Sequence, residues 1–285
     1  MTRYALPRQI DPHQEWSVAL QWDIWDVLSG KKILTLGSHL FALSQDGQWL
    51  AALTDQHTIQ ILSLGFLEQG LPTPMEILSS PQFANLVSLN WSPGGDQLAT
   101  ASSDGTIQVW ERANPSFVLQ TIHVLPTVPA LSLIQITMDW SPDMQSMATI
   151  PNGYGDNPPI EVWNLQTGQL RASYTRHTAQ PEDLTWLGND ILSSSENELA
   201  IWDTTTGQTR LSVKLDPMAL YSGLSWQISA DGNWLLVPTS SGLELINLGS
   251  KIVSRGMLLK DSLLSAVLSP DSTRLATVNI TGEVQ

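Results

Sequence analysis

The sequence predicts an all-β protein built from a repeated, four-stranded antiparallel unit. Three observations predict it: short strands that alternate apolar and polar residues, tight turns between them, and a repeat of this arrangement about every 40 to 50 residues. The clearest copy runs from Leu86 to Glu111, with the sequence LVSLNWSPGGDQLATASSDGTIQVWE. It serves as the reference for the other copies.

Three strands and two turns are expected in this copy. Apolar and polar residues alternate from Leu86 to Trp91, and Pro93 to Gly95 end that strand. A second strand, Gln97 to Ser102, is followed by Asp104-Gly105, a pair typical of a two-residue hairpin turn with positive φ angles. The third strand is Thr106 to Trp110. Three strands of this size cannot bury both faces, so the unit needs neighbours of its own kind.

Those neighbours are found on both sides of the reference copy. Tryptophans close the first strands of four units, at Trp91, Trp140, Trp186 and Trp226. The third strands end at Trp25, Leu62, Trp110, Trp163, Trp202 and Ile246. A turn and a fourth strand follow several of them, and Gly30, Gly168 and Gly207 occupy the same place in that turn, where a positive φ angle is easiest for glycine. Each unit is therefore a four-stranded meander.

This pattern resembles the WD-repeat family of β-propellers over nearly the whole chain. The resemblance is strongest in the Leu86 unit and in the pair Trp202-Asp203. It implies that each unit is one propeller blade, packed against the next.

Seven blades in a single domain, residues 1–285, are predicted from the starts of the second strands. These lie near Asp11, Asp46, Asp96, Asp143, Asp190, Asp231 and Asp271. In the first unit, Tyr4 to Pro7 is then a first strand and Asp11 to Leu20 contains the second. Two alternatives stay open: a six-bladed ring in which Asp23 to Leu36 completes the blade begun at Leu263, and a chain that is one part of a longer protein.

The charge of the chain limits its partners. With 27 acidic and 13 basic residues among 285, the formal net charge is −14. Such a charge repels phosphate groups, so nucleic acid and anionic membranes are not expected as partners, and a neutral or basic protein or peptide is. The N-terminus has no signal-peptide pattern and no apolar run has the length of a membrane span, which favours a soluble, cytoplasmic protein. The chain has no cysteine.

The resemblance also implies a hydrogen-bonded set within each blade: a histidine, a serine or threonine, an aspartate and the tryptophan of the third strand. The Leu86 unit offers Ser102, Asp104 and Trp110 without the histidine. Later units offer His123 or His177 without a clear aspartate. Buried polar groups of this kind satisfy one another, so a structural role is expected for them.

No catalytic, cofactor or metal site is expected. The sequence has no GxSxG, GxxxxGK[ST] or HExxH motif. The predicted function is a non-enzymatic scaffold or adaptor that binds a protein or peptide. The alternatives are a propeller enzyme, a hydrolase or lyase with its site at the mouth of the channel, and a structural or sensor domain of a longer protein.

Two long loops are the candidate contact surface. Pro151 to Pro159 joins a second strand to a third, and His123 to Ser132 connects two units. In a propeller both kinds of loop emerge on the same face, so they are expected to form one raised patch, with ordinary variation in loop length as the competing explanation. The candidate partner-binding residues are Tyr154, Asp156, Asn157, His123, Pro126 and Pro129.

Overall fold

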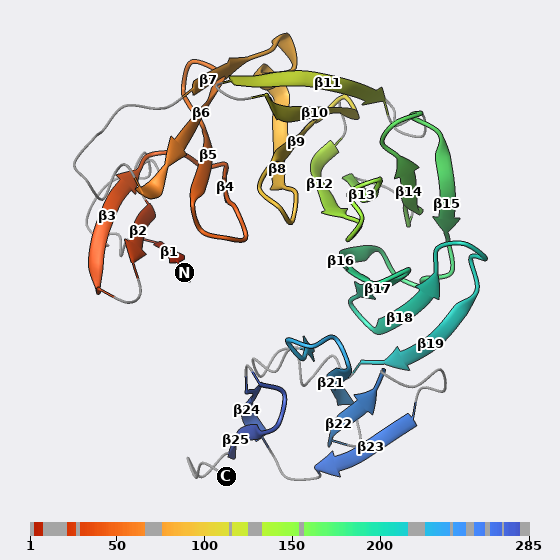
Figure 1. Cartoon of the computed structure of the whole chain (residues 1–285). Helices are drawn as coiled ribbons and strands as arrows, with labels where there is room; N and C mark the ends of the chain where they lie inside the picture. Colours follow the sequence, from red (N-terminus) through yellow and green to blue (C-terminus); the bar gives the residue numbers. More distant parts are fainter. Residues whose placement is uncertain are drawn as a thin grey trace. The chain divides into compact units, whose positions relative to one another are not determined.

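The computed structural model describes residues 3–7, 22–26, 29–65, 76–113, 116–124, 133–153, 157–215, 226–239, 242–248, 254–259, 263–269 and 271–279. These residues form seven antiparallel sheets (Figure 1) and one short 3-10 helix, η1 (Pro81–Asn85). The prediction of an all-β protein of repeated antiparallel sheets is confirmed. Among the described residues, no helix has the length and apolar character needed to cross a membrane.

Each predicted repeat contributes one sheet. The first contains β1 (Arg3–Pro7), β2 (Trp22–Asp26) and β3 (Lys31–Leu36). The second contains β4 (Phe41–Leu43), β5 (Trp49–Leu53), β6 (Thr58–Ser63) and β7 (Glu76–Ser79). The third contains β8 (Leu86–Trp91), β9 (Gln97–Ser102), β10 (Thr106–Ala113) and β11 (Ser116–Val124). The fourth contains β12 (Leu133–Trp140), β13 (Ser146–Gly153), β14 (Ile160–Asn164) and β15 (Leu170–Tyr174).

The remaining three sheets follow the same order. The fifth contains β16 (Pro181–Leu187), β17 (Asp190–Ser195), β18 (Glu198–Asp203) and β19 (Thr209–Lys214). The sixth contains β20 (Gln227–Ile228), β21 (Trp234–Thr239), β22 (Gly242–Asn247) and β23 (Ser254–Leu259). The seventh contains β24 (Leu263–Leu268) and β25 (Leu275–Asn279).

The chain divides into two compact units, residues 1–154 with 163–170, and residues 155–162 with 171–285. Within the first unit, the core lies between neighbouring sheets. The indole N–H of Trp91 donates to the carbonyl of Ala42 over 3.1 Å, and that of Trp140 donates to the carbonyl of Asn90 over 3.4 Å. These two first-strand tryptophans therefore connect the third sheet to the second and the fourth sheet to the third, as their repeat position predicts.

The turns explain where the glycines are. Gly30, Gly168 and Gly207 have φ angles of 65°, 70° and 66°, which confirms the prediction for the turn between the third and fourth strands. The two-residue turn predicted at Asp104-Gly105 is wrong. Only Gly105 has a positive φ, 84°, and its N–H donates to the carbonyl of Ser102 over 2.9 Å. The connection is a three-residue loop, 103–105, and its last residue, Gly105, is the one with the left-handed backbone conformation.

The first repeat differs from its prediction. β1 pairs directly with β2, with Tyr4 opposite Trp25, and takes the place of a second strand. The assignment of Tyr4 to Pro7 as a first strand is therefore wrong, and Asp11 to Leu20 lies outside the described residues. The number of blades in a ring and the single domain over residues 1–285 stay predictions.

Candidate functional site

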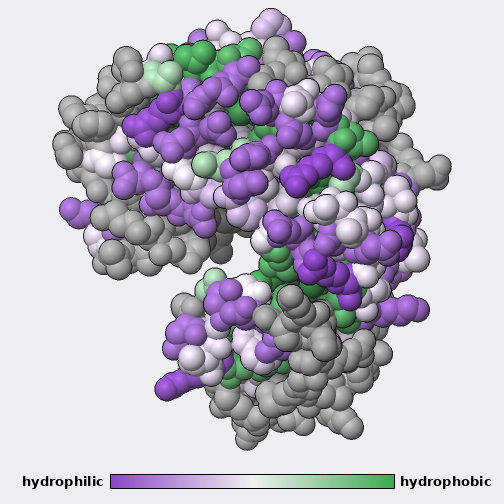
Figure 2. Space-filling view, turned by 45° about the vertical axis from the view of Figure 1, so that its right-hand side comes forward, coloured by the Kyte–Doolittle hydropathy of each residue, from purple (hydrophilic) through white to green (hydrophobic). Residues whose placement is uncertain are grey.

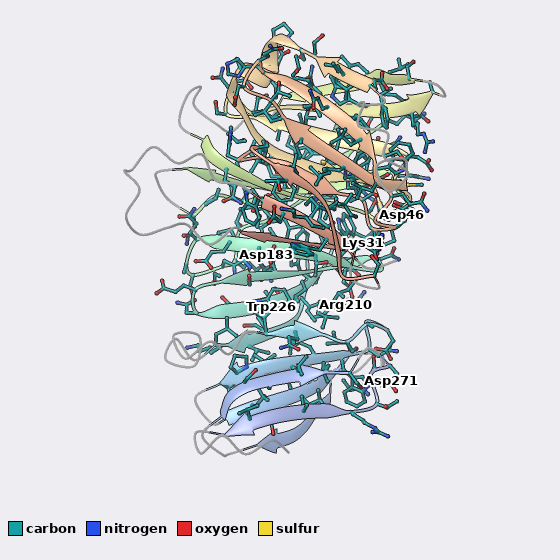
Figure 3. The ribbon with its side chains drawn as sticks, turned by 90° about the vertical axis from the view of Figure 1, so that its left-hand side faces the viewer. Lys31, Asp46, Asp183, Arg210, Trp226 and Asp271 are labelled. Atoms are coloured by element: carbon teal, nitrogen blue, oxygen red, sulfur yellow. The ribbon has the colours of Figure 1, made fainter. Side chains whose placement is uncertain are left out.

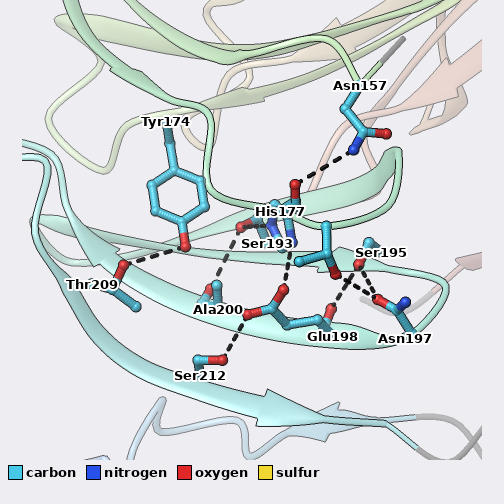
Figure 4. Close-up of polar contacts among 11 residues, drawn as sticks. Asn157, Tyr174, His177, Ser193, Ser195, Asn197, Glu198, Ala200, Thr209 and Ser212 are labelled. Carbon is cyan, nitrogen blue, oxygen red and sulfur yellow. Dashed lines mark hydrogen bonds and ion pairs between the residues drawn. The ribbon is translucent and has the colours of Figure 1, made fainter.

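A buried polar cluster lies at one end of the fifth sheet, in the second compact unit (Figure 4). Its centre is His177, in the segment that leads from β15 into β16, and only 7% of this residue is exposed. Tyr174, the last residue of β15, stands at the start of this segment. The connection between two blades thus carries a side chain into the interior of the next blade.

The imidazole of His177 has two polar neighbours. Its Nε2 lies 2.7 Å from the hydroxyl of Ser193 in β17, and Ser193 is fully buried. Its Nδ1 lies 3.8 Å from a carboxylate oxygen of Glu198 in β18, which is too long for a hydrogen bond. In a neutral ring protonated on Nδ1, Nε2 accepts a hydrogen bond from the hydroxyl of Ser193, and the N–H on Nδ1 faces the carboxylate without a hydrogen bond.

Glu198 is held by the outermost strand of the same sheet. Its second carboxylate oxygen accepts a hydrogen bond of 2.6 Å from the hydroxyl of Ser212 in β19. The cluster therefore spans β17, β18 and β19, since it joins Ser193, Glu198 and Ser212 around one imidazole. A side-chain network of this kind fixes the register of the strands that it crosses.

An aromatic stack covers the cluster. The ring of Tyr174 is stacked on Trp202, with centroids 5.0 Å apart and an interplanar angle of 10°. It meets His177 edge-on, with centroids 5.4 Å apart. The hydroxyl of Tyr174 lies 3.3 Å from that of Thr209. Because Trp202 is fully buried, the stack excludes water from one side of the imidazole.

Burial dominates the acid–base properties of this cluster. Desolvation lowers the pKa of His177, and the charge of Glu198 opposes this effect. Desolvation also raises the pKa of Tyr174, while its hydrogen bond to Thr209 acts in the opposite direction. At neutral pH both side chains are uncharged.

Ser193, His177 and Glu198 are the residue types of a hydrolytic triad, and their burial decides against that role in this conformation. A nucleophilic hydroxyl has to reach a substrate carbonyl and its histidine has to pass on the proton. Ser193 has no exposed surface, and its hydroxyl also lies 3.5 Å from the carbonyl of Ala200 within the sheet. The cluster therefore joins strands and has no access to a substrate.

Two other sheets contain a simpler version of this arrangement. The indole N–H of Trp110 donates to Thr100 over 3.4 Å, and that of Trp163 donates to Thr149 over 3.3 Å. The proposal that Ser102 pairs with Trp110 is therefore wrong, because the hydroxyl of Ser102 instead donates to the carbonyl of Gln82. Asp104 accepts from the N–H of Thr106 within its own turn.

The polar partners of these tryptophans and of His177 were not predicted from the sequence. Thr100, Thr149 and Ser193 each stand at the fourth position of the second strand, and this shared position is the signal that identifies them. Glu198 carries no such signal, because the equivalent residue in the reference unit is Thr106. His177 belongs to a unit without a clear aspartate, and it has Glu198 of the third strand, β18, beside it instead.

Above the cluster, the exposed ends of the strands carry amide and hydroxyl groups. The side-chain N–H of Asn157 donates to the backbone carbonyl of His177 over 3.4 Å (Figure 4). The hydroxyl of Thr178 lies 3.4 Å from the amide oxygen of Asn197, which is in the turn between β17 and β18. These contacts confirm that loops between blades and loops between second and third strands share one face. This surface, Asn157, Thr178 and Asn197, is called the loop face below.

The loop face is at the opposite end of the strands from the turns that join third and fourth strands. Figure 3 shows this for the fifth sheet, with Asp183 of β16 towards one edge and Arg210 of β19 towards the other. On the loop-face side, Glu182, Asp183 and Glu196 are exposed. This side of the sheet is therefore rich in carboxylates.

Of the six predicted partner-binding residues, the structure describes the side chain of one. Asn157 is exposed and borders the loop face. His123 pairs with Ile107 within β11, so its assignment to a loop is wrong and the connection begins after Val124. The side chain of His123 and the residues Pro126, Pro129, Tyr154 and Asp156 lie outside the described part of the chain.

The second predicted loop is also shorter than expected. Pro151, Asn152 and Gly153 belong to β13 and pair with β12, where Pro151 stands opposite Ile136. The loop therefore extends from residue 154 to residue 159.

Comparisons with known proteins agree with the division of the chain into repeated four-stranded sheets. Residues 74–111, which include β7 to β9 and most of β10, match the family described as "WD domain, G-beta repeat". The chain is 23% identical over 216 residues, 73% of its length, to the transcriptional corepressor LEUNIG_HOMOLOG of Arabidopsis thaliana. It is 30% identical over 125 residues, 40% of its length, to Cell division cycle 20.1, cofactor of APC complex, of the same plant.

A third relative is the small ribosomal subunit protein RACK1z of Oryza sativa subsp. japonica, 31% identical over 100 residues, 33% of this chain. The matched regions make up 24%, 25% and 29% of these three relatives. The chain thus spans less than a third of the length of each. Residues 74–111 therefore match a WD repeat, and the chain as a whole is similar to WD-repeat proteins, in agreement with its repeated four-stranded antiparallel sheets and tryptophan contacts.

Proposed function

We propose that this protein is a non-enzymatic scaffold or adaptor that binds a protein or peptide through the loop face. The names of its relatives support this, since they describe a corepressor, a cofactor of a complex and a ribosomal subunit protein. Fold alone does not define function, so a specific binding surface on this chain has to support the proposal as well.

The observation that carries the proposal is the contact from Asn157 to the carbonyl of His177. It connects the end of loop 154–159 to the segment whose side chain is fixed by Ser193. A loop that is held at one end by a rigid support loses less conformational entropy when it binds a partner. Tyr154 and Asp156 precede this contact in sequence, and we propose that they contact the partner together with Asn157.

The partner is proposed to be neutral or basic. The chain carries a net charge of −14, and Asp183 and Glu196 are exposed on the same side of the sheet as Asn197. Complementary charge increases association rates and selects among partners. The loop that follows Val124, with Pro126 and Pro129, is proposed as a separate contact.

The test compares the proteins captured by three forms of the intact chain. The first is the wild type, and the second carries Tyr154→Ala, Asp156→Ala and Asn157→Ala. The third, a matched control, carries Gln166→Ala and Gln208→Ala, which change exposed polar residues in turns between third and fourth strands. We expect the loop variant to lose partners that the control retains, at unchanged melting temperature. Identical partners for all three forms would contradict the proposed loop contact.

A further inference from the structure

We propose that the outer edge of β11 is a second binding surface, at which an extended peptide segment of a partner protein adds as a further strand. The peptide is proposed to be apolar at adjacent positions, one on each face of the sheet, and uncharged or basic. Such a surface serves a protein that binds partners, so it rests on the function proposed above.

β11 is an unusually long edge strand. It is the last strand of the order β8-β9-β10-β11 and has nine residues. The corresponding strands of the other sheets are shorter: β3, β19 and β23 have six residues, β15 has five and β7 has four. A long edge presents more unpaired backbone groups to an incoming strand.

β11 also lacks the charges that protect the other outer strands. Its sequence, SFVLQTIHV, contains no lysine, arginine, aspartate or glutamate. Each of the other last strands of the first six sheets contains at least one such residue: Lys31 and Lys32 in β3, Glu76 in β7, Arg171 in β15, Arg210 and Lys214 in β19, and Arg255 in β23. Charged residues on edge strands prevent the addition of further strands. β11 is therefore the outer strand on which strand addition is least opposed.

In the first half of β11, residues 116–120, the side chains divide between the core and the solvent. Phe117 packs edge-on against Trp91, with ring centroids 5.8 Å apart. Val118 is 50% exposed and Leu119 is 36% exposed. Figure 2 shows hydrophobic residues gathered at its upper edge, at the level that β7 and β11 occupy in Figure 1. The apolar exposure of the strand thus lies where an added strand would place its own side chains.

One outward-facing backbone group of β11 already binds an acceptor from another strand. The N–H of Phe117 donates to both carboxylate oxygens of Glu76 in β7, over 2.8 and 2.7 Å. In an antiparallel sheet, alternate residues of an edge strand direct their N–H and C=O away from the sheet. Glu76 therefore closes the beginning of the edge, and the segment from Val118 to Val124 offers the rest to a peptide.

The charge of the protein favours a partner's peptide over a second copy of the chain. Two copies would each bring a net charge of −14 to the contact, which opposes their association. A neutral or basic peptide does not meet that repulsion. Its backbone would supply the hydrogen bonds. Its adjacent side chains, which point to opposite faces of the sheet, would contact Val118 on one face and Leu119 on the other.

The experiment selects displayed random peptides of about ten residues on the intact wild-type chain, the length of a long strand. Selected peptides are then synthesised and titrated against three proteins: the wild type, the double variant Val118→Lys/Leu119→Lys, and Leu170→Lys. Leu170 is the matched control, because it is 48% exposed on β15, an outer strand that already carries Arg171. Circular dichroism and melting temperature show that each variant is folded.

We expect the double variant to bind the selected peptides about tenfold or more weakly, and Leu170→Lys to bind them as the wild type does. Hydrogen exchange should show that the bound peptide protects amides of β11. Peptides that bind the folded double variant equally well, protection confined to other strands, or a selection that yields no saturable binder would overturn the proposal.

Two further outcomes are distinguishable. A concentration-dependent dimer of the wild type, absent from the double variant in sedimentation, would assign the edge to a second copy and overturn the proposed occupant. Failure of the β11 proposal while loop variants still lose partners would leave the function proposed above in place. Failure of both tests would contradict the proposed function itself.

Discussion

Ser193 Oγ lies 2.7 Å from Nε2 of His177. Ser193 is a fully buried strand residue, and His177 belongs to the connection that precedes this sheet. This contact joins the segment before β16 to the second strand of the sheet that follows. The connection between two blades is therefore part of the interior of the next blade.

Removal of the Ser193 hydroxyl should destabilise the protein. Ser193→Ala leaves the buried Nε2 of His177 without its partner, and we expect a loss of about 1–3 kcal/mol in the free energy of unfolding. Ser212→Ala is the matched control, since it removes a hydrogen bond to Glu198 from an exposed position and should cost less. Urea denaturation followed by tryptophan fluorescence measures both. Equal effects would show that the contact between Ser193 and His177 is not the stronger one.

The stability of the protein should fall on mild acidification because of His177. Burial lowers the folded-state pKa of His177 below its usual value of 6.5, so the unfolded chain binds a proton first. The contribution is complete above the unfolded pKa and is lost as the pH falls from there towards the folded pKa. We expect His177→Gln to lose less stability than the wild type between about pH 7 and pH 5. Parallel curves for the two proteins would contradict this assignment.

Much of the fold could be predicted from the sequence because the repeat is local. Gly30 and Gly207 mark turns that need positive φ angles, and the structure shows them there. Trp91 and Trp140 were predicted at the ends of first strands and bond to the preceding blade. Each of these predictions depends on a few consecutive residues whose spacing alone fixes their place in a blade.

The missed features depend on contacts between separate segments. Glu198 lies beside His177 because β18 and the segment before β16 meet in space, although the residues are not part of one motif. β1 occupies the place of a second strand, which only its pairing with β2 reveals. His123 looks like a loop residue until the length of β11 is known. Pairing between segments decides these cases, and the sequence pattern does not contain it.

Trp202 should contribute more stability than a partly buried tryptophan. It is fully buried and stacked on Tyr174, and Trp202→Ala is expected to cost about 3–5 kcal/mol. Trp202→Phe keeps an aromatic ring for the stack and should cost less. Trp226, which is only partly buried, is the control, and Trp226→Ala should have the smaller effect. Thermal unfolding of the three variants ranks the costs, and a larger effect at Trp226 would refute the expected order.

Arg210 should control the acidity of Asp203. Its guanidinium donates to Asp203 over 2.6 Å, and with the N–H groups of Thr206 and Thr205 it holds the pKa of Asp203 at about 2. We expect Arg210→Gln to raise that pKa, as measured by carboxyl NMR titration. Lys214→Gln, on the same strand, should leave it at about 2. Because the folded pKa is lowered, the associated stability is present above the unfolded pKa and is lost as the pH falls towards 2.

Replacement of Met144 by glycine should be less harmful than the same change at neighbouring positions, because Met144 has a positive φ angle. Its φ angle is 58°, and its N–H donates to the carbonyl of Ser141 in the turn between β12 and β13. The same place in the equivalent turns is held by Gly47, Gly95 and Gly232, with φ angles of 67°, 72° and 70°. A side chain there is strained, whereas glycine is not.

We therefore expect Met144→Gly to stabilise the protein by about 0.5–1 kcal/mol, the relief of strain less the added flexibility of the unfolded chain. The reverse change, Gly95→Met, should destabilise it, because a side chain at a φ of 72° is strained; the space is sufficient for a Cβ atom, which would lie at ordinary contact distances of 3.7 Å from Ser44 and 3.8 Å from the ring of Trp49. Chemical denaturation of both variants measures the pair. A loss of stability in Met144→Gly would mean that the partly exposed methionine side chain contributes more through its contacts than the left-handed backbone costs.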